Sequence, residues 1–301
     1  MKRGILVYNP TAGQRDLRRP MNALIDRLRR RGLELVNAPT SGPGDATEIV
    51  RTFLTRGIDL VAVCGGDGTI SEAAAGLGGS PVPLGVLPGG TSNVLAVELG
   101  IPLELRRAEE VLLAGVPVSL RLGRADGRPF LLWAGVGLDA RVMRKMNLTL
   151  KRWFGRPGIS PTAGSQFLRY EFPRLEVEID GARHEATFAV VSRARHYGGN
   201  WIIAPEARTD ADTLDVLLFA HRDRWKLFRL FQEMKRGQSG HLTNGLARIV
   251  RGREVSIRSL ESYPVDVQVD GDCVLETPVA CSVGEERVRI LVPGGKSTMD
   301  G

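Results

Sequence analysis

The strongest constraint on the fold is the alternation of strand and helix patterns over residues 1–116. Short, continuous apolar runs are each followed by a segment whose apolar residues recur at helical spacing. Strands that alternate with helices favour right-handed crossovers and a parallel sheet. Residues 1–117 are therefore expected to form an α/β domain. Its expected strands are 4–9, 33–38, 59–64 and 83–87.

The pattern changes after about residue 117. Strand-like runs dominate, and several are joined by DG or GG turns, which is typical of antiparallel hairpins. Only two stretches, around 140–153 and at 224–237, read convincingly as helix. We expect a mostly β second domain over 118–284, while the closing segment 285–301 could return to the first domain. The expected strands are 118–127, 174–180, 185–194, 213–220, 254–259, 265–274 and 288–293.

The net charge of the chain limits the classes of binding partner that we expect. Lys and Arg number 41 against 34 Asp and Glu, a net charge of +7, which favours a nucleotide, a nucleic acid or a membrane surface unless it reflects genome composition. No nucleic-acid recognition motif accompanies the charge, so no nucleic-acid partner is expected. The sequence shows no apolar run of transmembrane length, no signal-peptide pattern and no CxxC among its three cysteines. These features predict a cytoplasmic protein.

Three Gly-rich turns each follow a predicted strand of the first domain: NPTAG (9–13), GGDGT (65–69) and PGGTSN (88–93). The carboxyl ends of parallel strands are where α/β sheets bind ligands. Glycines there let backbone N–H groups approach phosphate, and helix N-termini favour anions. One such turn is weak evidence, but three on one sheet edge indicate a phosphate site. Neither the GxxxxGK[ST] nor the GxGxxG fingerprint is present.

The order and spacing of these turns resemble the catalytic domain of the diacylglycerol kinase family, which includes sphingosine and ceramide kinases and soluble bacterial lipid kinases. The similarity spans nearly the whole chain. GGDGT alone is shared with NAD kinases and is similar to phosphofructokinase loops, whereas the later motifs are more specific. Those motifs are GTSN, AGVGLDARV (134–142), YGGNWIIAPEA (197–207), TDADTLDVLLF (209–219) and VDGD (269–272).

The resemblance implies an α/β nucleotide domain of the NAD kinase and phosphofructokinase type, followed by a β-sandwich, with the active site in a cleft between them. It also implies ATP and Mg²⁺ as cofactors and a lipid hydroxyl as acceptor. Asp67 is assigned to Mg²⁺ because an ionised carboxylate cannot donate to phosphate. The implied nucleotide-binding residues are Asn9, Pro10, Thr11, Ala12, Gly13, Thr40, Gly66, Asp67, Gly68, Thr69, Ile70, Ser71, Glu72 and Thr91, with Asn93 in support.

The hairpin VQVDGDCVL carries the implied catalytic base. In the family, this turn presents a carboxylate, usually the Glu of a DGE motif, to the substrate hydroxyl. Asp272 stands there in this sequence and is one methylene shorter. The residues alone favour simple turn chemistry, since DG is a strong hairpin signal. Asp270 is expected to hold the turn, and Asp139 is expected to support a metal or the base.

A second metal site is implied at the Asp-rich turn TDADTLDV. The family binds a structural Mg²⁺ there in a DDG-like turn. By position, Asp212 would supply a carboxylate, and Thr209 and Leu214 would supply backbone carbonyls. Thr213 replaces the expected Gly, so an ordinary Asp-rich surface turn is the open alternative.

Two segments are candidates for membrane contact. The helix at 224–237 has a stripe of Trp225, Phe228, Phe231 and Met234 among basic residues, for which packing on its own sheet is the favoured interpretation. The basic loop 144–158, with Trp153 and Phe154, is the better membrane candidate, although it could instead cover the cleft.

These observations predict a peripheral membrane lipid kinase that phosphorylates a lipid such as diacylglycerol. Two alternatives remain: an NAD kinase-like enzyme, and a non-catalytic regulator that binds nucleotide or lipid. The oligomeric state is open, a homodimer included.

Overall fold

The computed structural model describes residues 2–10, 17–145, 161–237 and 239–294, and the chain divides into two compact units. Unit 1 comprises Met1–Leu120 and Glu286–Gly301, and unit 2 comprises Arg121–Glu285. The junction after Leu120 lies within strand β5 (Val116–Ala125), as does the boundary expected after residue 117.

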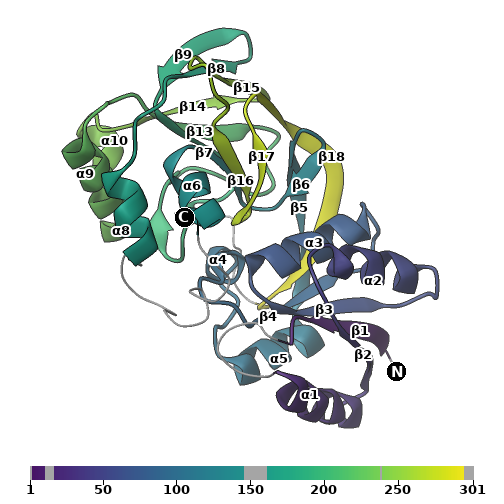
Figure 1. The fold of residues 1–301 in the computed structure, drawn as a ribbon. Helices are drawn as coiled ribbons and strands as arrows, with labels where there is room; N and C mark the ends of the chain where they lie inside the picture. Colours follow the sequence, from purple (N-terminus) through teal and green to yellow (C-terminus); the bar gives the residue numbers. More distant parts are fainter. Residues whose placement is uncertain (1, 11–16, 146–160, 238, 295–301) are drawn as a thin grey trace. The chain divides into compact units, whose positions relative to one another are not determined.

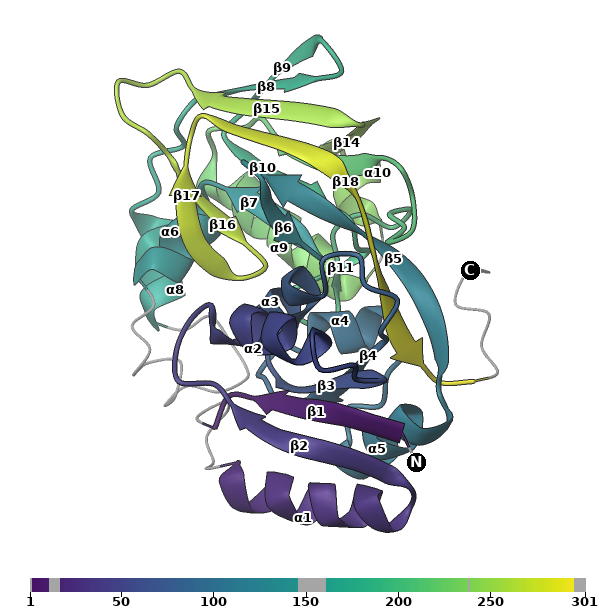
Figure 2. The same cartoon turned by 90° about the vertical axis from the view of Figure 1, so that its right-hand side faces the viewer.

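Unit 1 is built on a parallel sheet. Its strands lie in the order β2-β1-β3-β4, and the closing part of β18 (Val279–Val292) pairs parallel to β4 through Ile290 and Leu84. Figure 2 shows this arrangement. The four parallel strands therefore end at one sheet edge. They are β1 Lys2–Tyr8, β2 Leu33–Pro39, β3 Leu60–Gly65 and β4 Leu84–Pro88.

Helices cover both faces of this sheet, with α1 and α5 on one side and α2 and α3 on the other (Figures 1 and 2). In α1, Met21, Leu24 and Leu28 recur at helical spacing and are fully buried. An ion pair of 2.5 Å between Arg27 and Glu109 joins α1 to α5. The helices are α1 Arg18–Arg30, α2 Asp45–Leu54, α3 Asp67–Leu77, α4 Val94–Glu98 and α5 Leu105–Ala114.

Unit 2 is a β-sandwich. One sheet has the antiparallel order β14-β13-β10-β7-β16-β17, and β9, β8, β15 and the first part of β18 form the facing layer. The strands are β6 Arg128–Phe130, β7 Trp133–Val136, β8 Leu175–Ile179, β9 Ala182–Ala186, β10 Phe188–Ser192, β11 His196–Tyr197, β12 Trp201–Ile202, β13 Leu214–Phe219, β14 Arg248–Gly252, β15 Glu254–Ser259, β16 Asp266–Val269 and β17 Asp272–Glu276.

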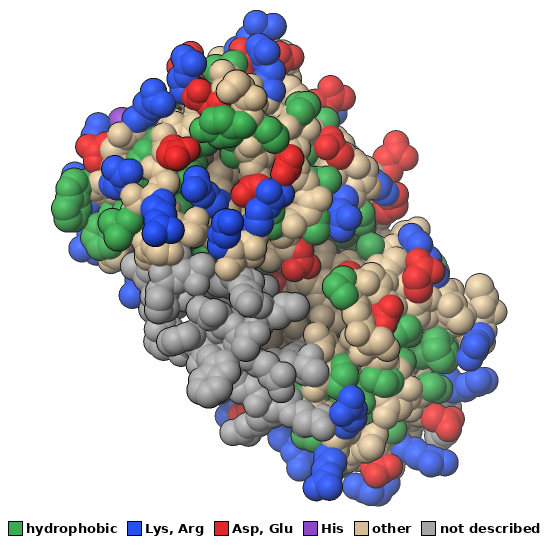
Figure 3. Space-filling model, viewed as in Figure 1, with side chains coloured by type: hydrophobic (Ala, Val, Ile, Leu, Met, Phe, Trp, Pro, Cys, Tyr) green, Lys and Arg blue, Asp and Glu red, His purple; other side chains and the backbone are tan. Residues whose placement is uncertain are grey.

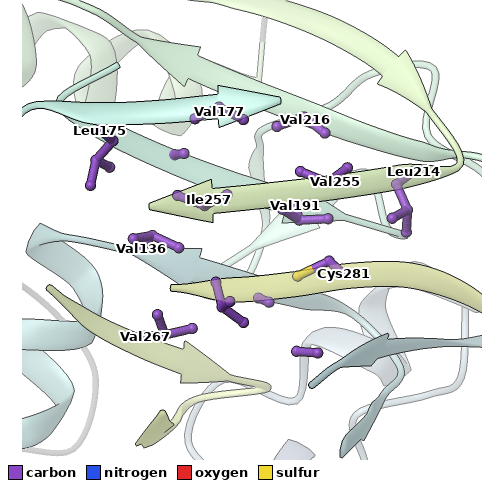
Figure 4. Close-up of a cluster of buried hydrophobic side chains, with 14 of the residues drawn as sticks. Val136, Leu175, Val177, Val191, Leu214, Val216, Val255, Ile257, Val267 and Cys281 are labelled. Atoms are coloured by element: carbon purple, nitrogen blue, oxygen red, sulfur yellow. The ribbon is translucent and has the colours of Figure 1, made fainter. Parts of the chain in front are cut away.

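Aliphatic side chains from the two layers fill the core of the sandwich (Figure 4). Strand β8 alternates buried and half-buried residues, so Leu175, Val177 and Ile179 point inward. Strands β10 and β13 are buried throughout, as expected for central strands covered on both faces. The sequence prediction of an α/β domain followed by a β-sandwich is confirmed.

Unit 2 also carries more helix than its sequence predicted. Beside α6 (Leu138–Lys145) and α9 (Arg224–Arg236), the structure contains α8 (Pro161–Leu168) and α10 (Gly240–Thr243), so the expectation of only two helical stretches is wrong. Within the described part of the chain, no helix has the length and apolar character needed to cross a bilayer.

Candidate active site

Two of the predicted Gly-rich turns contact each other directly through their backbones. The Gly89 N–H donates to the carbonyl of Gly65 at 3.0 Å. A Cβ atom on Gly90 would lie 2.4 Å from the Cα of Gly66, so no larger residue fits there. The turns that follow β3 and β4 therefore form one continuous stretch of backbone, mostly half-buried, at the carboxyl edge of the unit 1 sheet.

Helix α3 begins immediately after this contact. Gly66 is its N-cap in an extended conformation, and glycine has no side chain with which to cap the first turn. The Ile70 N–H is the first in α3 to bond back, at 3.2 Å to the Gly66 carbonyl. An uncapped helix N-terminus offers backbone donors and a positive partial charge to an anion. Gly68, Thr69 and Ser71 lie in this opening part of α3.

Asp67 has a structural partner that its sequence position did not reveal. Its two carboxylate oxygens accept hydrogen bonds from the backbone N–H groups of Val94 (3.1 Å) and Leu95 (3.0 Å), so Asp67 caps α4. Burial raises the pKa of Asp67, and the two amides act in the opposite direction. Each oxygen with one amide partner keeps a lone pair, so the carboxylate is compatible with a role in holding Mg²⁺.

Asn93 closes the PGGTSN turn. It adopts a left-handed conformation with φ of 48°, which Asn tolerates better than most residues. Its Oδ1 accepts the Gly90 N–H at 2.8 Å, and its Nδ2 donates to the Gly90 carbonyl at 3.0 Å. Thr91 lies exposed within the turn.

The other residues that the sequence predicted to bind nucleotide differ in how deeply they are buried. Asn9 and Thr40 follow β1 and β2 at the same sheet edge, and the Thr40 N–H donates to the Tyr8 carbonyl at 2.9 Å. Ile70 is fully buried, so its side chain belongs to the core. Glu72 accepts the Gly44 N–H at 2.8 Å, at the start of α2. Pro10 is buried, while Thr11, Ala12 and Gly13 lie outside the described residues.

In unit 2, the predicted catalytic hairpin forms a tight two-residue turn. Asp270 and Gly271, with φ of 47° and 92°, join β16 to β17 in the geometry of a type I′ turn. Asp270 is 4% exposed, and its carboxylate is fully engaged with backbone donors. It accepts hydrogen bonds of 2.7–3.1 Å from the consecutive N–H groups of residues 131, 132 and 133. Asp272, the first residue of β17, has an exposed side chain.

A buried network of hydrogen bonds through Gln268, Asp139 and Tyr197 holds this turn. Gln268, 1% exposed, accepts the Gly271 N–H at 2.7 Å and donates to the Asp139 carboxylate at 3.1 Å. The Tyr197 hydroxyl donates to the same Asp139 oxygen at 2.9 Å. Burial raises the pKa of Asp139, while these donors oppose the shift. Sequence reasoning missed Gln268, because an isolated Gln within a strand carries no motif.

The Asp-rich turn does not fit the metal site that the sequence implied. The Thr209 carbonyl accepts hydrogen bonds from the Arg121 N–H at 3.0 Å and from the Arg193 side chain at 2.8 Å. Asp212 is half-exposed and forms an ion pair with Arg253. Leu214 is the first residue of β13, paired with Gly252. Among the described residues, no three His, Cys, Asp or Glu side chains are placed to hold a metal ion.

Comparison with known families agrees with this architecture. The family model of the diacylglycerol kinase catalytic domain matches residues 3–125. The model of the YegS C-terminal, NAD kinase β-sandwich-like domain matches residues 133–292. A crystal structure of a diacylglycerol kinase from Bacillus anthracis superposes with a TM-score of 0.72 at 22% identity and covers 97% of each chain.

Curated relatives match along nearly their whole length. A diacylglycerol kinase of Mycobacterium tuberculosis is 28% identical and covers 95% of this chain and 93% of its own. The diacylglycerol kinase of Bacillus subtilis is 26% identical, with 90% of both chains covered. A Pseudomonas aeruginosa protein described as a probable lipid kinase YegS-like is 28% identical, with 97% and 94% covered. The matched domains and the named relatives support a lipid kinase. The chain belongs to the diacylglycerol kinase family.

Proposed function

We propose that this protein transfers the γ-phosphate of ATP to a hydroxyl group of a lipid such as diacylglycerol, with Mg²⁺ as cofactor. The observation that carries the proposal is the pair of glycine turns packed backbone to backbone beside the uncapped N-terminus of α3. Such an edge supplies donors for phosphate without any P-loop lysine. The family membership makes a kinase the matching chemistry.

On the nucleotide side, the backbone of residues 66–69 would contact the phosphates, with Asn9, Thr40 and Thr91 at the same sheet edge. Asp67 would hold Mg²⁺, directly or through water, with the lone pairs that its α4 partners leave unused. Magnesium supplies neutralisation of the phosphate charge when it is bound.

On the acceptor side, Asp272 would act as the general base. Its exposed carboxylate takes the proton of the lipid hydroxyl, whose oxygen forms a bond to the γ-phosphorus while the bond to the leaving ADP oxygen breaks. Asp270, Gln268 and Asp139 contact no reacting atom in this proposal. They fix the hairpin that presents Asp272.

A surface formed by α8 and α9 fits the edge of an anionic membrane. Trp225 and Leu168 are 78% and 68% exposed, and Phe228 contacts both Trp225 and Phe167. Figure 3 shows Lys and Arg side chains gathered over this part of unit 2. An apolar tip surrounded by basic residues is the usual pattern of an interfacial helix. The exposed basic residues of α9 and its entry are Arg222, Arg224, Lys226, Arg229, Lys235 and Arg236.

The buried face of α9 differs from the apolar stripe that the sequence predicted. Leu227, Leu230 and Met234 form its buried face, and the Phe231 ring contacts the Phe188 ring at a tilted angle, so most of the helix packs on its own unit. Trp225 instead points to solvent. The other expected membrane segment, the loop 144–158, lies almost entirely outside the described residues.

Turnover with labelled ATP tests the proposal. The purified protein is assayed with mixed micelles of diacylglycerol, a sphingoid base or an anionic phospholipid, and separately with NAD. We expect a labelled, organic-soluble product with a lipid acceptor and none with NAD. Phosphorylation of NAD would instead establish the NAD kinase alternative. Nucleotide binding without turnover on any acceptor would establish the non-catalytic alternative.

A further inference from the structure

Arg193 is a charged side chain that unit 2 buries almost completely. It follows strand β10 and is 1% exposed. An arginine is permanently charged and is rarely buried without partners. The partners of its guanidinium group therefore need to be identified.

The guanidinium group lies among backbone carbonyl groups. Its Nη2 donates to the carbonyls of Thr209 and Ala211, both at 2.8 Å. Its Nη1 donates to the Thr213 carbonyl at 3.0 Å, and its Nε donates to the Arg121 carbonyl at 3.1 Å. Three of these four acceptors belong to the Asp-rich turn that precedes β13.

The positive charge of Arg193 also acts on nearby carboxylates. It contributes to lowering the pKa of Asp210, after the larger effect of Arg208. Burial raises the pKa of Asp215, and the charges of Arg251 and Arg193 oppose that rise. Carbonyl oxygens grouped beside carboxylates are the environment that a hard cation such as Mg²⁺ prefers. In this chain, a side chain occupies that environment.

Two of the oxygen ligands that the sequence implied at this turn already have other partners. A carbonyl oxygen has two lone pairs, and the Thr209 oxygen already accepts from Arg121 and Arg193. Asp212 turns its carboxylate to Arg253. Two of the three ligands that the sequence implied are therefore committed to arginines.

We propose that the guanidinium group of Arg193 is the resident cation of the turn at residues 209–213, and that this turn folds without a divalent metal. The charge is covalently attached and does not dissociate. The order of the turn is therefore independent of the free Mg²⁺ concentration. This inference does not depend on the phosphoryl transfer proposed above.

A melting comparison without nucleotide tests the proposal. The unfolding temperatures of the wild-type protein and of Asp212→Asn are each measured in a chelator and in excess magnesium chloride. We expect the shift between the two buffers to be equal in the two proteins, because Asp212 ligates no metal. A magnesium-dependent stabilisation that Asp212→Asn abolishes would overturn the proposal.

A second comparison tests the side chain itself. Arg193→Ala removes the donors of four carbonyls and should lower Tm by on the order of 10 °C. Arg253→Ala, which removes the exposed partner of Asp212, should change Tm by no more than about 2 °C. If Arg193→Ala does not fold, Arg193→Lys replaces it, with an intermediate loss expected. A smaller loss at position 193 than at position 253 would refute the assignment.

Discussion

Two aspartates that are two residues apart in one hairpin have opposite environments. Asp270 is buried and accepts three backbone hydrogen bonds, whereas Asp272 is exposed at the start of β17. Burial and hydrogen bonding make a carboxylate structural, while exposure leaves its basicity available for chemistry. The two residues should therefore separate stability from activity.

Asp272→Asn keeps the size and the turn propensity of the residue but cannot take a proton. We expect turnover at saturating ATP and lipid to fall by roughly 10²–10⁴-fold, with Tm and ATP affinity nearly unchanged. Asp272→Glu tests the length of the side chain. Equal or higher activity would mean that a longer side chain brings the carboxylate at least as well into range of the lipid hydroxyl. Wild-type turnover in Asp272→Asn would show that Asp272 is only a turn residue.

Asp270→Ala should have the reverse effect. Three buried N–H groups lose their acceptor, and a left-handed position loses a residue that tolerates it, so the free energy of unfolding should fall by at least about 3 kcal/mol. Denaturant unfolding measures this loss. Asp272→Ala is the matched control, since it removes a carboxylate from the same hairpin and should leave stability within about 0.5 kcal/mol. Similar losses in both variants would contradict the division of roles.

At the scale of elements, the short helix α4 depends on a carboxylate from α3. Asp67→Asn leaves only one acceptor oxygen for the amides of Val94 and Leu95, so both the helix start and the PGGTSN turn should loosen. We expect a loss of about 1–2 kcal/mol in unfolding free energy together with lost turnover. Asp26→Asn, which removes an exposed charge from α1, is the control and should change neither. Full stability in Asp67→Asn would leave metal binding as the only role of Asp67.

The α8–α9 surface predicts salt-sensitive membrane binding. Trp225→Ala should weaken binding to vesicles that contain anionic lipid, and binding of the wild-type protein should fall as salt rises, since screening acts over about 8–10 Å at physiological ionic strength. Co-sedimentation measures both effects. Leu103→Ala, at an exposed apolar residue of unit 1, is the control. Equal binding by the two variants would place the membrane contact elsewhere.

Much of the element pattern could be predicted because it depends on local sequence. The continuous run at 59–64 became β3, and the periodic segment at 17–32 became α1. The run 185–194 was predicted as one strand but divides into β9 and β10. The break falls at Thr187, whose N–H and hydroxyl bond the Phe219 carbonyl. That contact is tertiary, and no Gly or Pro marks it in the sequence.

The site was less predictable than the fold, because its supporting residues act through distant partners. The glycine turns are visible as motifs, but the Asp67 bonds to α4 and the contacts of Arg193 join residues far apart in the chain. Arginine is usually a surface residue, so nothing in the sequence around Arg193 indicated that it is buried. Nothing in the sequence indicated the burial of Gln268 either.

At the scale of the whole molecule, the unfolding of the two units can be followed by separate signals. The four tryptophans, at positions 133, 153, 201 and 225, all belong to the chain segment of unit 2. Ile290→Ala removes a fully buried side chain from the part of β18 that pairs with β4 in unit 1. A buried Ile to Ala change costs roughly 2–5 kcal/mol.

We therefore expect Ile290→Ala to lower the transition seen by far-UV circular dichroism more than the transition seen by tryptophan fluorescence. ATP should restore part of the loss in the dichroism signal. The control is Val255→Ala, a buried change within unit 2, which should shift the fluorescence transition more. If Ile290→Ala displaces both signals equally, the two units unfold as one.

The return of β18 to unit 1 also has a consequence for synthesis on the ribosome. Unit 2 is a single stretch, Arg121–Glu285, and can be completed as soon as it leaves the exit tunnel. The unit 1 sheet waits for Ile290 to pair with Leu84, so the first-made half of the protein is the last to be finished. Until then β4 is paired only with β3, and its other edge offers unpaired backbone groups that are a target for chaperones and for aggregation in the cell.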